Sequence, residues 1–369
     1  MQPKKRVLML MGGRSGEYEV SLNSARSIMA VLDPARYDVT AVGITRQGIW
    51  LSGENVLAAF DSGQTAALER VTLLPYPGSR TLYALRGACL EPICEFDVVF
   101  PVLHGTFGED GTVQGLLELA DVPYVGAGVL GSAVGMDKGL FKDLMRMVNV
   151  PVLPSLLVTR HELEGDLTAI IAQAEAVSDY PLFTKPANLG SSVGVSKCRN
   201  RSDLMEGLMD AARYDRRVLV ERGLDKPREI EIGVLGNDQP LASLPGEIVP
   251  GDDFYSYRAK YLDDSSELHI PAALNAAQIQ QMQQIAVRAF QAIDCAGMAR
   301  VDFLVDRPTG KIFVSEINTI PGFTRISMYP KAWGASGVAY PELVNRLIDL
   351  ALRRKIDRDR TEHTYEGAK

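Results

Sequence analysis

At 369 residues the chain is longer than one compact domain usually is, so its length predicts two or three domains. With 46% hydrophobic and 23% charged residues, its composition is typical of a globular protein. Asp and Glu outnumber Lys and Arg by 46 to 39, a net charge of −7, which argues against nucleic acid or an anionic membrane as the main partner. An anionic ligand would therefore have to be held by a few local cations.

The N-terminal third alternates strands with helices, which predicts a parallel α/β sheet. The expected elements are a strand at 6–13, a helix at 20–32, a strand at 37–45, and a strand at 96–104 that precedes another helix. The apolar run at 6–13 is too short for a signal peptide. Ligands bind beyond the carboxyl ends of such strands, where the loops at 12–21 and 104–111 lie. The segment 52–94 is expected to be a peripheral elaboration.

The rest of the chain predicts antiparallel α+β structure. Asp137 is expected to cap a helix that ends at Pro151. Strands and helices then alternate at 153–159, 167–177, 180–186, 202 onward and 217–222. A hairpin is expected about the turn Gly236-Asn237-Asp238. A long helix follows at about 279–293, and a last helix at 341–353 is expected to end in a frayed tail.

The four cysteines form neither a CxxC pair nor a disulfide framework of the secreted type. We expect Cys89, Cys94, Cys198 and Cys295 to be free or buried thiols in a reducing compartment. No segment reaches the roughly 20 consecutive apolar residues that a membrane span requires.

The stretch 297–327 predicts a hairpin with metal-binding chemistry. Two apolar-rich strands flank the turn Pro308-Thr309-Gly310, and numbering about Thr309 places Asp302 opposite Glu316. Strand alternation adds Asn318 and Arg300 to the same face. Two facing carboxylates and an amide oxygen suit Mg²⁺, which is completed by water and substrate phosphates. We also expect Leu304 and Val314 on this face, so that it is partly buried.

A glycine- and serine-rich loop after Lys185 is the candidate phosphate site. Gly190 and Gly194 allow backbone N–H groups to approach an anion, and Ser191 and Ser192 add hydroxyl donors. The loop is not a Walker A motif, because the lysine precedes the glycines.

In chain order, five segments together resemble the D-alanine-D-alanine ligases of the ATP-grasp superfamily. They are HGTFGEDG (104–111), KPANLGSSVGVSK (185–197), FYSYRAKY (254–261), ARVDFL with EIN (299–318) and NTIPGFTRIS (318–327). The resemblance implies an N-terminal Rossmann-like preATP-grasp domain at 1–137, followed by a two-part ATP-grasp fold. Its central subdomain would span 138–227, and its C-terminal subdomain 228–369, with a lid loop at about 247–268.

The activity implied by the resemblance is ATP-dependent joining of two D-alanines through an acyl phosphate, for peptidoglycan precursors. It implies ATP as co-substrate, two Mg²⁺ ions with Mn²⁺ as a substitute, a cytoplasmic location and a homodimer. The metal ligands would be Asp302, Glu316 and Asn318. The nucleotide would be bound by Lys138, Lys185, Ser192, Glu221, Glu229 and Lys260.

For the amino acids, the resemblance implies that Glu17 holds the first ammonium and His104 the first carboxyl group. Arg300 and the Gly322 N–H would stabilise the oxyanion, and Ser327 and Met328 would bind the second carboxylate. Tyr261, linked to Ser191 and Glu17, accompanies dipeptide formation in this family, whereas the D-lactate ligases carry histidine there. A ligase that uses D-lactate or D-serine, and an inactive nucleotide-binding protein, remain alternatives.

Overall fold

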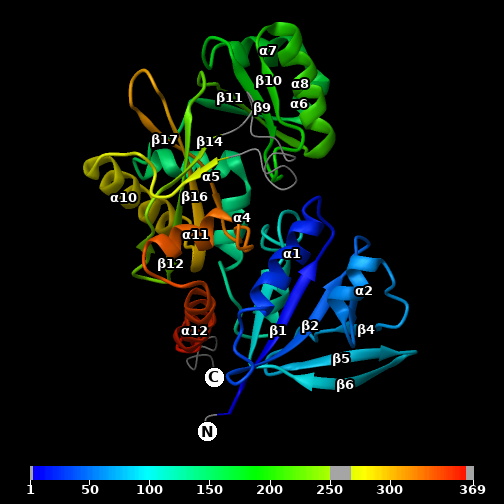
Figure 1. The fold of residues 1–369 in the computed structure, drawn as a ribbon. Coiled ribbons are helices and arrows are strands. Elements are labelled where there is room, and N and C mark those ends of the chain that lie inside the picture. The colour runs from blue at the N-terminus through cyan, green and yellow to red at the C-terminus, as the bar shows by residue number, and fades with distance from the viewer. Residues whose placement is uncertain (1–2, 250–266, 363–369) are drawn as a thin grey trace, which may run out of the picture.

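The computed structural model describes residues 3–249 and 267–362, and these form three sheets with helices packed on them (Figure 1). The first sheet has the strand order β6-β5-β4-β3-β2-β1-β7. Its parallel part consists of β1 (Lys5–Gly12), β2 (Tyr37–Ile44) and β7 (Val98–Val102), which confirms the predicted parallel α/β start. Helices α1 (Tyr18–Met29) and α3 (Thr112–Leu119) follow β1 and β7.

The segment 52–94 forms the outer end of this sheet, in agreement with a peripheral elaboration, and it consists of regular strands that the weak periodicity did not predict. Antiparallel strands continue the sheet from β2: β3 (Trp50–Ser52), β4 (Glu69–Thr72), β5 (Thr81–Arg86) and β6 (Cys89–Glu95). Helix α2 (Val56–Ser62) packs on β2. Val71 and Leu82 are buried in the same core as β1, which explains why the strands hold despite their weak alternation in sequence.

The second sheet is antiparallel, as predicted, in the order β10-β9-β11-β8. Its strands are β8 (Ser155–Thr159), β9 (Leu182–Pro186), β10 (Ser196–Cys198) and β11 (Arg217–Arg222). The helices α6 (Arg160–Gly165), α7 (Leu167–Glu175) and α8 (Arg201–Tyr214) cover one face (Figure 1). Their apolar sides share one core with the sheet, so the other face is left for the site.

The third sheet contains the candidate hairpin and has the order β15-β14-β12-β16-β17, with β13 paired to β12. The strands are β12 (Arg228–Gly236), β13 (Leu241–Ala242), β14 (Gly246–Val249), β15 (Glu267–His269), β16 (Gly297–Val305) and β17 (Ile312–Asn318). The helix α10 (Ala276–Ala292) packs on one face, together with α4 (Val129–Met136) and α5 (Lys138–Met147). As predicted, Asp137 caps α5 by accepting the Leu140 N–H at 2.9 Å.

The register of β16 and β17 is as predicted at the carboxylates. Asp302 lies opposite Glu316, and Arg300 lies opposite Asn318. A bulge directly after Asp302 then pairs Phe303 with Val314, so the expectation for Val314 was wrong. Val314 is fully buried in the core on the opposite face, beside Phe303, because the extra residue shifts the alternation by one.

The described end of the chain, up to residue 362, is more regular than expected, while the rest of the predicted frayed tail lies outside the described residues. Helix α12 (Tyr340–Arg358) extends five residues beyond the predicted helix end, and α11 (Met328–Ala335) precedes it. Arg358 contacts Asp121 at 3.0 Å, and Lys355 contacts Asp121 at 3.2 Å. These ion pairs hold α12 against the end of α3. Among the described residues, no helix is long and apolar enough to cross a membrane.

Candidate active site

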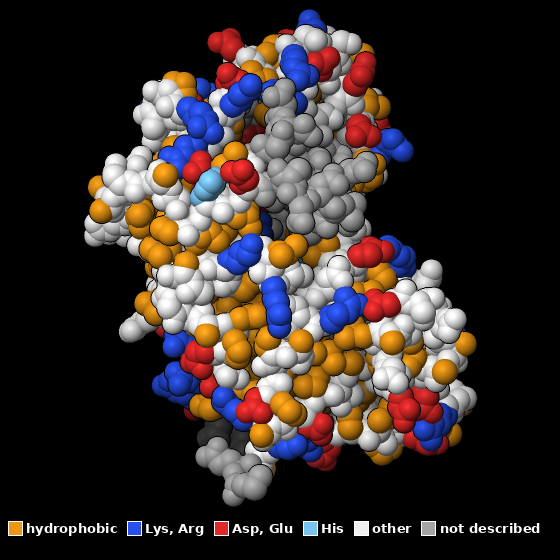
Figure 2. Space-filling model, in the orientation of Figure 1, with side chains coloured by type: hydrophobic (Ala, Val, Ile, Leu, Met, Phe, Trp, Pro, Cys, Tyr) orange, Lys and Arg blue, Asp and Glu red, His pale blue; other side chains and the backbone are white. Residues whose placement is uncertain are grey.

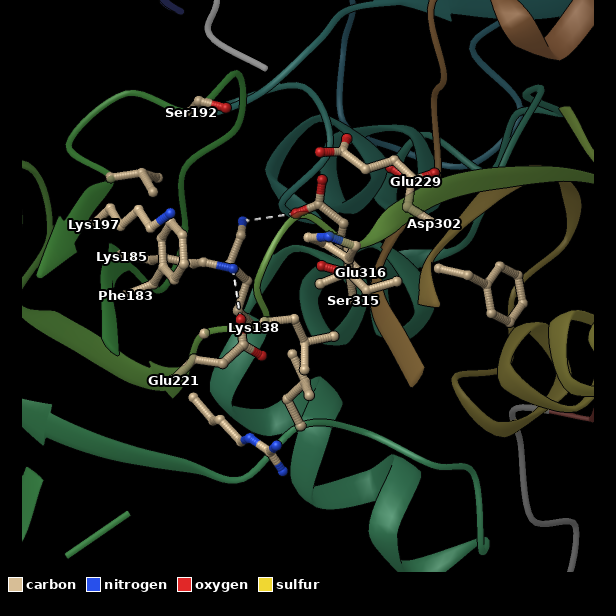
Figure 3. Close-up of a pocket in the computed structure, with 18 of the residues that line it drawn as sticks. Lys138, Phe183, Lys185, Ser192, Lys197, Glu221, Glu229, Asp302, Ser315 and Glu316 are labelled. Carbon is tan, nitrogen blue, oxygen red and sulfur yellow. Dashed lines mark hydrogen bonds and ion pairs between the residues drawn. The ribbon is translucent and has the colours of Figure 1, made fainter. Parts of the chain in front are cut away.

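A pocket lies between the second and third sheets, and its walls carry most of the predicted nucleotide and metal residues (Figure 3). Strands β9 and β11 form one wall, and β12, β16 and β17 form the other. The loop 187–195 lies over it. The predicted residues that line the pocket are Lys138, Lys185, Ser191, Ser192, Glu221, Glu229, Asp302 and Glu316.

Two lysines reach toward carboxylates from opposite sides of this pocket. Lys185 on β9 donates to Glu221 Oε2 at 2.6 Å, and Lys138 lies 3.5 Å from Glu316 Oε2 (Figure 3). Lys138 also donates to the Leu189 carbonyl at 2.7 Å, so it ties the start of α5 to the loop above the pocket. These cations are the local positive charge that an anionic ligand of an acidic protein requires.

Glu221 is buried but remains ionised. Burial would raise the pKa of its carboxyl group, yet Lys142 and Lys185 outweigh this effect and hold the pKa at about 2. The same carboxylate raises the pKa of Lys185 against the opposing effect of burial. Lys142 forms an ion pair with the other oxygen, Glu221 Oε1, and was not among the residues predicted from the sequence. Its spacing of four from Lys138 on one helix is the signal that could have found it.

The carboxylate face of the hairpin is neutralised in part by arginine. Arg300 binds both oxygens of Asp302, at 2.7 and 2.6 Å, and contacts Glu231 at 3.0 Å. Asn318 donates its amide N–H to Asp302 Oδ2 at 3.0 Å. The predicted metal ligands and the predicted oxyanion donor are therefore adjacent on one face, as the strand alternation indicated.

The oxygen donors of this face fit a hard divalent cation. Asp302, Glu316 and Asn318 supply two carboxylates and one amide oxygen next to a lysine-lined pocket, the donor set that Mg²⁺ combines with water and phosphate oxygens. In the described part of the chain, no group of three or more His, Cys, Asp or Glu side chains lies close enough together to hold a metal ion.

In the part of the site expected to bind the amino acids, Glu17 contacts the loop between β9 and β10 of the second sheet. Ser191 donates its hydroxyl to Glu17 Oε1, although the two residues are 174 positions apart. Glycines make room for this carboxylate: a Cβ would lie 2.6 Å from Glu17 Oε2 at Gly105 and 2.7 Å from it at Gly190. The predicted link between Ser191 and Glu17 is thus present in the geometry.

His104 is held by the protein through both ring nitrogens. Nδ1 donates to the Ile320 carbonyl at 2.8 Å, and Nε2 lies 3.1 Å from the Ser24 hydroxyl, which itself accepts the Phe323 N–H at 3.2 Å. Burial lowers the pKa of the His104 ring, so a neutral ring with the proton on Nδ1 satisfies this chain of bonds. The histidine therefore fixes the loop that follows β17.

Glu109 reinforces the same loop and was missed, although it lies in the HGTFGEDG motif. Its carboxyl group accepts the Gly105 N–H at 2.8 Å and the Ile320 N–H at 2.9 Å. Burial, followed by the nearby charge of Glu17, raises the pKa of Glu109 to about 8. Glu109 thus binds the N–H of Ile320, and His104 binds its carbonyl.

The other predicted amino-acid residues lie at the start of α11. Ser327 precedes that helix, and its hydroxyl oxygen accepts the Thr324 N–H at 3.0 Å. A Cβ at Gly322 would lie 3.2 Å from Ser327 Oγ, so these two predicted residues are neighbours. Met328 is the first residue of α11 and is buried. Lys260 and Tyr261 lie outside the described residues, and their roles remain predictions.

The lid loop expected at about 247–268 also lies mainly outside the described residues. Its described ends belong to β14 and β15, which pair antiparallel. On the face drawn in Figure 2, acidic and basic side chains are intermixed, and no broad basic area covers it.

Two α+β layers that enclose a pocket lined by lysines and carboxylates have the architecture of the ATP-grasp ligases. The chain belongs to the D-Ala-D-Ala ligase family, because the family models for the N-terminus and the C-terminus match residues 6–127 and 144–349.

Its relatives include proteins of nearly the same length. It is 50% identical to the D-alanine--D-alanine ligase of Heliobacterium modesticaldum over 97% of both chains, and 48% identical to that of Acetivibrio thermocellus over 97% of this chain and 98% of the relative.

Solved structures agree with the same fold. The D-alanine-D-alanine ligase from Coxiella burnetii superposes with a TM-score of 0.81 at 37% identity, covering 96% of both chains. The VanG D-Ala:D-Ser ligase from Enterococcus faecalis superposes with a TM-score of 0.83 at 33% identity, covering 95% of this chain and 100% of the other.

Proposed function

We propose that this protein joins two D-alanine molecules into D-alanyl-D-alanine at the expense of ATP. One observation carries the proposal: a single small cavity is lined by Glu17, Lys138, Glu316 and Asn318. The carboxylate suited to an ammonium group and the groups suited to a metal-bound phosphate therefore face one space. A ligase that activates an amino-acid carboxylate with a nucleotide phosphate needs this proximity, because its two substrates must react at van der Waals distance.

In the first step, a carboxylate oxygen of the first D-alanine attacks the γ-phosphorus of ATP, and the bond to the β,γ-bridging oxygen breaks to release ADP. We assign Glu17 to its ammonium group, and Lys138 and Lys185 to the phosphates. Asp302, Glu316 and Asn318 would hold Mg²⁺ or Mn²⁺, which when bound neutralises charge on the phosphate oxygens. The described residues form no covalent bond in this step, so positioning and charge supply the catalysis.

In the second step, the ammonium group of the second D-alanine loses a proton to water, and the resulting amine attacks the acyl-phosphate carbonyl. The attacking nitrogen then loses a second proton, which the departing phosphate takes up. The tetrahedral oxyanion collapses, and inorganic phosphate leaves. We assign Arg300 and the Gly322 N–H to that oxyanion, and Ser327 and the Met328 N–H to the second carboxylate. His104 is proposed to act by fixing the loop that carries Gly322. Ser192, Glu221, Glu229 and Lys260 are assigned to the nucleotide.

The runner-up substrate for the second site is D-serine or D-lactate. The VanG relative is named a D-Ala:D-Ser ligase, but relatives named D-alanine--D-alanine ligase are more similar, at up to 50% identity. Neutral Tyr261, if it lies beside the second substrate, does not repel an ammonium group, whereas a cationic histidine would favour a neutral hydroxy acid.

Substrate pairs distinguish these possibilities. ADP release and product mass are measured with D-alanine alone, and then with D-alanine plus D-serine or D-lactate. We expect D-alanine alone to give the dipeptide and to dominate in both mixtures. Product only in a mixture would overturn the substrate assignment, and no D-alanine-dependent ADP formation would favour an inactive nucleotide-binding protein.

We further propose a homodimer in the cytoplasm that supplies peptidoglycan precursors, with the division at residues 138 and 228 given above. Sedimentation of the purified chain tests the dimer. The metal is tested by titrating Mg²⁺ and Mn²⁺ into the metal-free protein with ADP present, and following binding by calorimetry.

A further inference from the structure

Lys142 lies one helical turn after Lys138 on α5, and its side chain points to the interior behind the nucleotide pocket. Its side chain is 1% exposed, and it pairs with Glu221, whose side chain is 2% exposed. It does not line the pocket, whereas Glu221 and Lys185 do. A lysine is almost never buried to this degree without a partner, so the ion pair is the reason for its position.

We propose that Lys142 is a positioning residue of the nucleotide site, which takes up the charge of Glu221 and thereby leaves the charge of Lys185 available to the ATP phosphates. The inference rests on the proposed function only in taking ATP as the ligand of this pocket.

The argument is one of charge and access. Glu221 is shared by two lysines, one on each carboxylate oxygen, so the three groups together carry one surplus positive charge. Lys142 is enclosed, while Lys185 is 17% exposed and lines the pocket, so the surplus charge is accessible at Lys185. Without Lys142, Lys185 would only neutralise a buried carboxylate, and Lys185 itself would offer no surplus charge to an anion.

Geometry makes the arrangement stiff. Glu221 lies on β11 and Lys185 on the adjacent β9, where Leu219 is the direct partner of Lys185 in the ladder. Lys142 comes from α5, which packs with the third sheet instead. The ion pair therefore links a helix of one layer to a strand of the other, directly behind the pocket. Burial lowers the pKa of Lys142 and Glu221 acts against this effect, while Arg146 lowers that pKa further. Glu316 and Glu229 add to the effect of Glu221 in raising the pKa of Lys185.

The test is the affinity for ADP in the presence of Mg²⁺, measured by calorimetry without D-alanine. Lys142→Met should raise the Kd by about 10- to 100-fold, the effect of losing one charge-assisted contact. The KM for D-alanine should change less than twofold. Because the calorimetric Kd for ADP needs no ligation, it tests the proposal even if the chain makes no dipeptide.

A matched control separates positioning from stability. Lys355 on α12 is also a buried lysine, with 7% exposure and ion pairs to Asp121 and Asp359, but it does not line the nucleotide pocket. Lys355→Met should lower the melting temperature and leave the Kd for ADP within twofold of the wild type. An equal loss of ADP affinity in both variants would overturn the proposal.

A double-mutant cycle tests whether Lys142 acts through Glu221. With Glu221→Met as background, Lys185 is no longer tied to a carboxylate, so adding Lys142→Met should change the Kd by less than twofold. The same large loss in both backgrounds, or no loss in the wild-type background, would overturn the proposal. If Lys142→Met does not fold, Lys142→Gln takes its place in the cycle.

Discussion

Ser191 donates its hydroxyl to the carboxylate of Glu17, and this bond joins the loop over the nucleotide pocket to the first sheet. Ser191→Ala removes the only atom that makes the contact. Because a hydrogen bond to a charged group contributes about 1.5–3 kcal/mol, we expect kcat/KM for D-alanine to fall about 10- to 100-fold. ADP release kinetics measure this, with the exposed Ser62→Ala as the control. An unchanged kcat/KM would show that the bond is not used in turnover.

Glu316 faces Asp302 across the hairpin, and its side chain is 27% exposed. We expect Glu316→Ala to lower turnover by about 100-fold or more, since it removes an electrostatic group at the reacting phosphate. The melting temperature without metal should change little, because the substitution relieves repulsion between two acids. Glu342→Ala, which removes an exposed carboxylate on α12, should leave turnover unchanged. A large fall in melting temperature would instead indicate a structural role for Glu316.

Glu109 makes stability depend on pH. Its pKa rises from an ordinary 4.5 to about 8 in the folded protein, first through burial and then through Glu17. The folded state then retains a proton that the unfolded chain releases, so this group lowers the free energy of unfolding as pH rises from about 4.5 to 8. Glu109→Gln lacks this dependence, although it loses one backbone contact at every pH.

The difference in free energy of unfolding, Glu109→Gln minus wild type, should therefore increase with pH, by on the order of a few kcal/mol between pH 5 and 8. Urea unfolding at several pH values measures it. The same comparison for Glu342→Gln, an exposed residue, should be flat. A flat difference for Glu109→Gln would show that the carboxyl group is already ionised at pH 5.

Gly190 leaves space for the Glu17 carboxylate, and a Cβ there would lie 2.7 Å from Glu17 Oε2. We expect Gly190→Ala to displace Glu17 and to raise the KM for D-alanine about tenfold or more, with little change in ADP affinity. Gly115→Ala is the matched control. Its Cβ would meet nothing within 4 Å, so it should be neutral or stabilise α3 by up to about 1 kcal/mol.

Local patterns were enough to predict the hairpin and its register at the carboxylates. Alternation along β16 and β17, with a turn between them, placed Asp302 opposite Glu316 and Arg300 opposite Asn318. The period of two and the chain reversal placed these residues on one face, but the strands next to the turn pair Val305 with Ile312, and only the bulge brings Asp302 opposite Glu316. The sequence pattern does not predict the bulge that turns Val314 inward, because the bulge depends on how the strand packs on the core.

Residues that act across the fold were the ones missed. Glu109 and Lys142 each lie in a segment that was singled out, but their partners Ile320 and Glu221 are far away in the sequence. Only the packing of separate layers brings these partners together. The four-residue spacing from Lys138 places Lys142 on the same helix face, but it does not identify Glu221 as its partner. The described end of α12 was likewise expected to fray, since its ion pairs to Asp121 depend on a distant helix end.

The hydrophobic core of the first sheet includes α12. Leu343 and Leu347 lie in one cluster with Val7, Met9 and Phe100. During synthesis, the apolar face of β1 and β7 is therefore not covered until α12 has been made. We expect a chain that ends at Gly337 to be cleaved by protease within 6–127 much faster than the full chain; equal cleavage would contradict this. The first part of the fold is thus completed only after α12 has been made.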